Sequence, residues 1–122
     1  MYGICGGCSF QHLSSENQII AKQSWLQSAF IGQAKTEPKN WLKPMQVQSW
    51  GYRRKARLGV RYVAKKEKVL VGFRERKSSF ITVMSRCEVL HPSLGDNLEI
   101  IAECIGKLSI REHVPQIEAA IA

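Results

Sequence analysis

The spacing of apolar residues changes along the chain, and each spacing predicts a different element. Near the N-terminus, apolar positions recur every three or four residues, as on one face of an amphipathic helix: Ile19, Leu26, Ala29 and Phe30. We therefore expect a helix over residues 15–31, capped by Ser14 or Ser15. A loop at 1–13 precedes this helix, and a proline-containing linker at 33–46 follows it.

After the linker the period shortens to two, which is typical of β-strands. Apolar and basic residues alternate in the first run: Lys55, Ala56, Arg57, Leu58, Gly59, Val60, Arg61 and Tyr62. This pattern predicts a half-buried strand with one basic face. A polar turn at 64–68 and a second alternating run at 69–73 predict a hairpin. We expect a third strand at 80–84, which completes a basic β-meander over 47–86.

Two further elements are expected after the meander. A second helix at 93–108 is indicated by an apolar stripe: Leu94, Leu98, Ile101, Ile105 and Leu108. Residues 114–121 have the pattern of a last strand. The expected fold class is therefore α+β, with an antiparallel sheet of three to four strands and two helices packed on it. A length of 122 residues suits one domain.

The composition narrows the class of protein. An apolar fraction of 44% argues against disorder, and no apolar run approaches the length of a membrane-spanning helix. We also find no basic region followed by an apolar run at the N-terminus, as a signal peptide would have. The expected location is cytoplasmic, with no membrane partner and no protein partner. In that compartment thiols are reduced or bound to metal.

Charge is concentrated in one part of the sequence. The net charge is +8, and residues 51–77 alone hold eleven Lys or Arg against two acids, Glu67 and Glu75. Such a segment predicts a surface patch for a polyanion, although a solvated strand face is the simpler alternative. The candidate RNA-binding residues are Arg53, Arg54, Lys55, Arg57, Arg61 and Arg74. On an unbroken strand, alternate cations lie about 6–7 Å apart, which suits successive phosphates.

Aromatic residues and glycines accompany these cations. Trp50, Tyr52 and Phe73 are candidates for stacking on bases, although aromatics at strand ends more often belong to the core. Gly59 and Gly72 would allow a nucleic-acid backbone to approach the sheet closely. Strand kinks without a ligand are an equally good explanation of both glycines.

Four cysteines form the second candidate site. Cys5 and Cys8 are separated by two glycines, a spacing that lets two thiolates face one metal centre, and Cys87 follows the expected third strand. Cys104 lies in the second helix and fits a core position better than a ligand. If Cys104 were a fourth ligand, zinc would become the alternative metal. No strand precedes Cys5, which disfavours a thioredoxin-type redox pair.

Three sequence motifs, taken in their order along the chain, also resemble those of a known family. They are Cys5-Gly6-Gly7-Cys8-Ser9-Phe10-Gln11-His12-Leu13, Trp50-Gly51-Tyr52-Arg53-Arg54-Lys55-Ala56-Arg57-Leu58, and Cys87. Together they closely resemble the RumA group of 23S rRNA (uracil-5-)-methyltransferases. The family's members bind a [4Fe–4S] cluster through four cysteines, three of which match Cys5, Cys8 and Cys87. The position of the fourth falls before Met1.

The resemblance implies that RNA binding and catalysis lie in different domains of a longer enzyme, of which this chain would be one part. Residues 1–122 would form the central, RNA-contacting domain of an enzyme whose substrate is 23S ribosomal RNA. The S-adenosylmethionine site and the catalytic residues would lie in a domain outside this chain, and this chain alone would be inactive. Two other readings remain: a freestanding zinc- or cluster-bearing nucleic-acid-binding module, and a small redox enzyme using Cys5 and Cys8.

Overall fold

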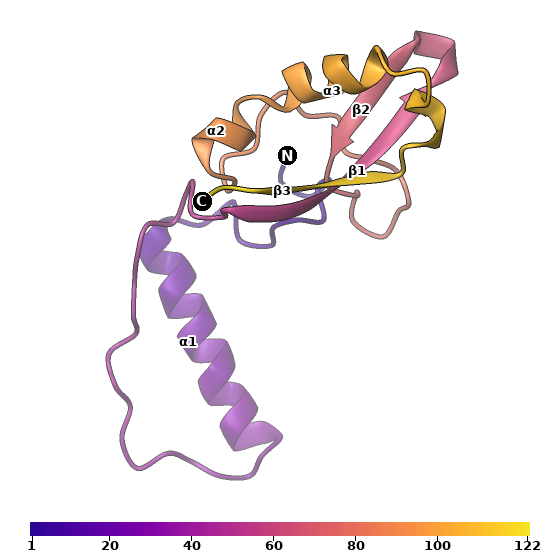
Figure 1. Cartoon of the computed structure of the whole chain (residues 1–122). Coiled ribbons are helices and arrows are strands. Elements are labelled where there is room, and N and C mark those ends of the chain that lie inside the picture. The colour runs from indigo at the N-terminus through magenta and orange to yellow at the C-terminus, as the bar shows by residue number, and fades with distance from the viewer. The chain divides into compact units, whose positions relative to one another are not determined.

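The chain forms two compact units in the computed structural model, which describes all of residues 1–122. Residues 1–9 and 48–122 form one unit, which we call the sheet unit, and residues 10–47 form the other, the helix unit. Figure 1 shows the elements of each. No helix in either unit combines the length and hydropathy that crossing a bilayer requires.

The helix unit consists of one long helix and an irregular segment. Helix α1 spans Ser15–Gly32, as the spacing of apolar residues predicts. Ser14 is the N-cap, and its hydroxyl accepts a hydrogen bond from the backbone N–H of Asn17 at 3.3 Å. Residues 33–46 contain no helix or strand, as expected of a linker. The Phe30 ring meets the Trp41 ring edge-on, with centroids 5.9 Å apart.

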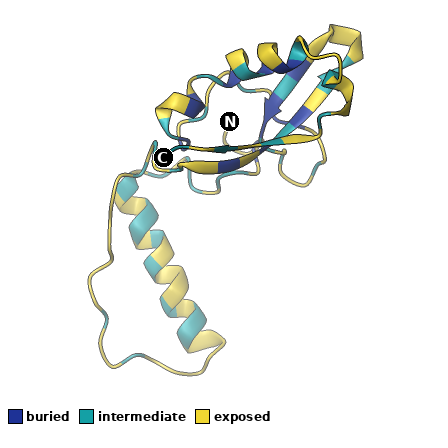
Figure 2. Ribbon diagram, in the orientation of Figure 1, coloured by how far each residue is buried: buried dark blue, intermediate teal, exposed yellow.

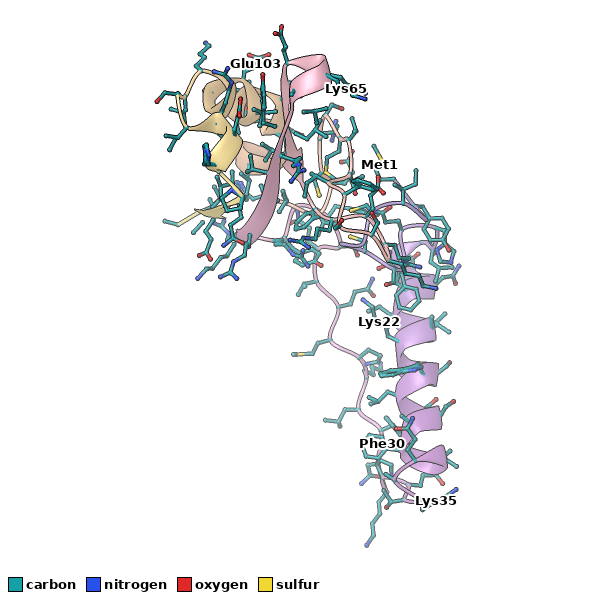
Figure 3. The ribbon with its side chains drawn as sticks, turned by 90° about the vertical axis from the view of Figure 1, so that its right-hand side faces the viewer. Met1, Lys22, Phe30, Lys35, Lys65 and Glu103 are labelled. Atoms are coloured by element: carbon teal, nitrogen blue, oxygen red, sulfur yellow. The ribbon has the colours of Figure 1, made fainter.

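The sheet unit is built on three antiparallel strands in the order β2-β1-β3. Strand β1 spans Lys55–Val63, β2 spans Lys68–Gly72 and β3 spans Gln116–Ala120. A short 3-10 turn, η1 (Ala64–Lys66), joins β1 to β2, and Lys65 lies on it at the end of the hairpin (Figure 3). The sheet confirms the α+β class and the antiparallel arrangement.

Of the two further strands expected after the hairpin, the one at 114–121 is present as β3 and the one at 80–84 is wrong. Residues 80–84 form no strand, and only Ile81 makes an isolated bridge, with Arg74. The C-terminal segment takes that place: β3 pairs with β1 in the register Leu58↔Ile117. The apolar run at 80–84 packs over the sheet instead, with Ile81 over Gly59 and Thr82 and Met84 over Gly72.

The expected second helix is divided in two. Helix α2 spans Pro92–Gly95 and α3 spans Leu98–Gly106, with a break at Asp96 and Asn97. The imidazole Nδ1 of His91 accepts a hydrogen bond from the Ser93 amide at 3.3 Å and so caps α2. The connecting segment that ends the helical region contains a further 3-10 turn, η2 (Arg111–His113).

One apolar core holds the sheet unit together. It lies between the inward face of β1 and β2 and the two helices α2 and α3, shown as dark blue segments in Figure 2. The most deeply buried apolar side chains are Leu58, Leu90 and Leu98, each 1% exposed or less. Because successive strand residues point to opposite faces, burying Ala56, Leu58 and Val60 leaves their neighbours on the outward face.

Candidate nucleic-acid interface and cysteine loop

The outward face of β1 carries basic side chains, as the alternation predicts. Lys55, Arg57 and Arg61 are exposed, while the residues between them are buried or half-buried. Lys55 and Arg61 form no ion pair with any acid. This face of β1 therefore presents uncompensated positive charge to solvent at its two ends.

Another segment of the chain covers the middle of the outward face of β1, between Arg57 and Arg61. Gly59 and Gly72 stand opposite each other on β1 and β2, and residues 81–84, the crossing segment, cover both. A Cβ added at Gly59 would lie 2.3 Å from Cδ1 of Ile81, and one at Gly72 would lie 3.1 Å from the carbonyl oxygen of Thr82. The prediction that these glycines admit a nucleic-acid backbone is therefore wrong, because residues 81–84 already use that space.

Arg57 forms an ion pair with Glu118, an acid that no local pattern in the sequence places beside it. Arg57 and Glu118 are direct partners in the β1–β3 register, and Nε of Arg57 donates to Oε1 of Glu118 at 2.8 Å. Both side chains remain substantially exposed, at 66% and 49%. An ion pair this open to water is weak, so Arg57 stays available to an external anion at small cost.

The other candidate cations have different surroundings. Arg53 is half-buried, and its guanidinium lies over the Phe73 ring, 5.6 Å from the centroid. Arg54 is exposed and donates from Nη1 to the carbonyl oxygen of Ala122 at 2.9 Å. Arg74 is exposed and forms no ion pair. Lys55, Arg61 and Arg74 are thus the candidates whose charge no other group in the chain shares.

Phe73 is half-buried, and other groups of the sheet unit already contact its ring. The guanidinium of Arg53 lies over the ring, and a Cβ added at Gly7 would lie 3.3 Å from the ring carbons. Phe73 therefore belongs to the packing of the sheet unit. Trp50 and Tyr52, the other two aromatic candidates, remain exposed at 41% and 54%.

The cysteine loop, residues 4–9, lies along one edge of the hairpin formed by residues 73–82. Cys5 and Glu75 form an antiparallel bridge, with the Gly6 amide donating to the Arg74 carbonyl at 2.8 Å and the Arg76 amide to the Ile4 carbonyl at 2.7 Å. A Cβ at position 6 would lie 2.9 Å from the Arg74 oxygen, so only glycine permits this approach.

The two thiols of the loop differ in exposure. Cys5 is 5% exposed, and its sulfur accepts a hydrogen bond from the Gly7 amide at 3.4 Å. Cys8 is half-buried. The Arg76 side chain reaches the loop through Nη2, which lies 3.5 Å from the Cys8 carbonyl oxygen and 3.4 Å from the Ser9 hydroxyl. The loop is therefore tied to the basic segment by backbone and side-chain hydrogen bonds.

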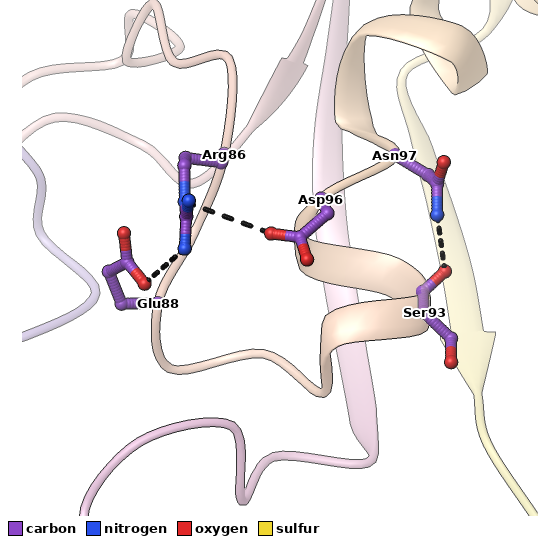
Figure 4. A network of polar contacts seen from close by, with 5 residues as sticks. All are labelled: Arg86, Glu88, Ser93, Asp96 and Asn97. Atoms are coloured by element: carbon purple, nitrogen blue, oxygen red, sulfur yellow. Dashed lines mark hydrogen bonds and ion pairs between the residues drawn. The ribbon is translucent and has the colours of Figure 1, made fainter.

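Cys87 is fixed by contacts with the core and with α2. It is half-buried against the core, and its amide donates to the Gly95 carbonyl at 3.1 Å. Arg86 adds an ion pair to Glu88 at 2.7 Å and a longer one to Asp96 at 3.7 Å (Figure 4). These contacts anchor the Cys87 backbone at the end of α2.

Comparison with known proteins relates the chain to one enzyme class. It is 68% identical over all of its 122 residues to "23S rRNA (uracil(1939)-C(5))-methyltransferase RlmD" of Vesicomyosocius okutanii, and 50% identical over 120 residues to the enzymes of that name in Methylococcus capsulatus and Nitrosococcus oceani. The resemblance seen in the sequence motifs is confirmed. The chain spans only 27–28% of the length of these relatives, so it matches one segment of such methyltransferases. No family model matches the chain.

In this methyltransferase-related segment, Cys5 and Cys8 lie in the cysteine loop, and Cys87 comes from the segment that precedes α2. No group of three or more His, Cys, Asp or Glu side chains is arranged to hold a metal ion. Cys104 is exposed on α3 rather than in the core, contrary to expectation. The ligand set Cys5, Cys8 and Cys87 therefore stays a prediction from the sequence.

One pocket of the methyltransferase-related segment lies apart from both candidate sites. It has a volume of about 710 Å³ and lies between β2, residues 82–85 and α3. Its walls mix apolar groups such as Val71 and Leu98 with Lys68 and Glu99. None of the cysteines and none of the six candidate RNA-binding residues lines it. The pocket adds no chemistry to either site.

Proposed function

We propose that this chain is the RNA-contacting segment of a 23S rRNA uracil-C5 methyltransferase. The observation that carries the proposal is the exposed, unpaired charge of Lys55, Arg61 and Arg74 around the crossing segment. Positively charged side chains in a row bind phosphates and release counterions, which supplies sequence-independent affinity. The names of the relatives support 23S ribosomal RNA as the polyanion.

The chemistry of methyl transfer belongs, in this proposal, to the rest of the longer protein. S-adenosylmethionine and the catalytic residues would be held outside these 122 residues, and none of the four cysteines acts as the nucleophile. The chain by itself is then expected to bind RNA without methylating it. An RNA-dependent methylation assay with labelled S-adenosylmethionine tests this division, and incorporation above background by the isolated chain would contradict it.

The RNA-binding role is tested by the salt dependence of affinity. With four to six phosphates contacted, log affinity should fall against log salt with a slope of roughly −3 to −5. Fluorescence anisotropy with a labelled single-stranded RNA measures this directly. A slope near zero would exclude the outward face of β1 as a phosphate-binding surface, because counterion release is then absent.

We further propose that Cys5, Cys8 and Cys87 are ligands of a [4Fe–4S] cluster in the longer protein. The support is the Cys-Gly-Gly-Cys spacing, the Gly7 amide that donates to the Cys5 sulfur, and the family resemblance. When bound, such a cluster supplies folding free energy by joining distant segments. Iron and acid-labile sulfide should fall in Cys5→Ser, Cys8→Ser and Cys87→Ser. Cys104→Ser, which alters the exposed thiol, is the matched control and should keep both.

A further inference from the structure

The hairpin formed by residues 73–82 carries an exposed aromatic side chain, Phe80. The Glu75 amide donates to the Phe80 carbonyl at 2.9 Å, and the Thr82 amide donates to the Phe73 carbonyl at 2.9 Å. On the other edge of the 73–76 strand, the cysteine loop adds the hydrogen bonds described above. Residues 73–76 are thus hydrogen-bonded on both edges, and Phe80 is hydrogen-bonded to one of these edges rather than lying in a free loop.

The Phe80 ring points away from the sheet. Ile81 is buried over Gly59, and because neighbouring residues of an extended segment point to opposite sides, Phe80 faces outward. The ring is 72% exposed. An apolar surface that stays in water adds nothing to the free energy of unfolding. Packing within the sheet unit therefore does not explain a phenylalanine at this position.

The surroundings of this ring are basic. Within six residues the same hairpin carries Arg74, Arg76 and Lys77, all exposed, against one acid, Glu75. Lys77 has a positive φ of 59°, which marks the tight turn of the hairpin. An exposed aromatic ring between cations is the combination that binds single-stranded nucleic acid: the ring stacks on a base while the cations bind the flanking phosphates.

We propose that Phe80 stacks on an unpaired RNA base, and that Arg74 and Lys77 contact the phosphates on either side of it. The proposal rests on the proposed function and specifies its partner: an unpaired stretch of RNA rather than a continuous duplex. Sequence reasoning missed Phe80 because it was assigned to a sheet strand. Phe73, one of the three aromatic candidates from the sequence, is half-buried and has the Arg53 guanidinium over its ring.

The test compares Phe80 with Val83, a nearby exposed apolar residue outside the proposed contact. Val83 is also an exposed apolar residue, at 62%, and lies three residues further along the same segment. With a fluorescein-labelled 12-nucleotide oligouridine, Phe80→Ala should weaken binding by about 5-fold or more, as for the loss of one base stack. Phe80→Trp should retain the affinity, and Val83→Ala should leave it unchanged.

The salt dependence of the affinity distinguishes the contribution of base stacking from that of phosphate contacts. Stacking involves no counterions, so Phe80→Ala should keep the slope of log affinity against log salt that the unaltered chain shows. An oligomer of the same length in which abasic sites replace the bases should bind the chain and Phe80→Ala equally. Thermal unfolding followed by circular dichroism checks that the variants are folded.

The outcomes distinguish this inference from the proposed function. If the chain binds with the expected salt slope while Phe80→Ala and Val83→Ala behave alike, the stacking inference is overturned and the RNA-contacting role stands. If the chain shows no salt-dependent binding to oligouridine, the proposed function and the inference both fail. Equal affinity for oligouridine and for a 12-base-pair RNA duplex would also overturn the preference for unpaired RNA.

Discussion

Cys5 and Glu75 face each other in an antiparallel bridge, which joins the start of the chain to the end of its basic segment. The sequence suggested that such a connection would be made through sulfur and Cys87. In the structure it is made first by the backbone, through the hydrogen bonds of Gly6 and Arg76. These backbone hydrogen bonds therefore help to position the cysteine loop, and substitutions in it should act on the hairpin.

Gly6→Ala should loosen this connection. The added Cβ would lie 2.9 Å from the Arg74 carbonyl oxygen, and a backbone atom cannot move aside as a flexible side chain does. We expect a loss of about 1–3 kcal/mol in the free energy of unfolding and faster hydrogen exchange at the Arg76 amide. Gly32→Ala is the control, because a Cβ there meets nothing within 4 Å. Equal exchange in both variants would contradict the role assigned to Gly6.

Gly59→Ala should clash with the crossing segment, and the clash should be relieved by a second change. The new Cβ would overlap Cδ1 of Ile81, the one carbon that Ile81→Val removes. We expect each single variant to be less stable, and the double variant to be more stable than the sum of the two predicts, by about 0.5–3 kcal/mol. Urea unfolding of the four proteins measures this coupling. Strict additivity would mean that Ile81 does not lie over Gly59 in solution.

Thr82→Val should be neutral or stabilising. Thr82 is 1% exposed, and its hydroxyl oxygen is buried without a hydrogen-bond partner. Valine has nearly the same shape and removes the buried polar group, a change expected to add up to about 1 kcal/mol to the free energy of unfolding. Thr82→Ser keeps the hydroxyl and removes the methyl group, so it should destabilise the protein. A lower urea midpoint for the valine variant than for the serine variant would show that the hydroxyl has a partner.

Glu118→Gln should strengthen RNA binding, because it releases Arg57 from its ion pair. We expect a roughly 1.4- to 5-fold tighter Kd for oligouridine, which corresponds to the roughly 0.2–1 kcal/mol of an exposed pair, and little change in stability. Glu112→Gln removes an equal charge from an exposed residue that forms no ion pair. If both variants tighten binding equally, net charge rather than the Arg57 contact is responsible.

Arg61→Ala should weaken RNA binding and lower the salt dependence. Arg61 is exposed and unpaired on the outward face of β1, so its removal should reduce the slope of log affinity against log salt by about 0.7–0.9. Lys107→Ala removes the same charge at the end of α3, outside the basic segment. An equal change in slope for the two variants would count against β1 as the contact surface.

Local pattern was enough to predict much of the fold. The helix of α1, the β1–β2 hairpin and the last strand follow from residue spacing, since side chains repeat every 3.6 residues in a helix and every two in a strand. The exposed basic face of β1 follows for the same reason. Spacing could not show that residues 80–84 lie over the sheet, because a short apolar run suits a segment packed on a sheet as well as a strand within it.

What the sequence by itself determined is therefore the kind of each element and the charge of its faces, both of which depend on neighbours within a few residues. Only the tertiary structure decided which distant residues meet: Glu118 beside Arg57, Ile81 over Gly59, and the cysteine loop against Arg74–Arg76. These contacts depend on strand register and chain crossing, which bring together residues more than sixty positions apart, 61 for Arg57 and Glu118 and 68 for Cys8 and Arg76. No local pattern encodes such pairings, because their free energy arises only when the whole sheet unit has closed around its core.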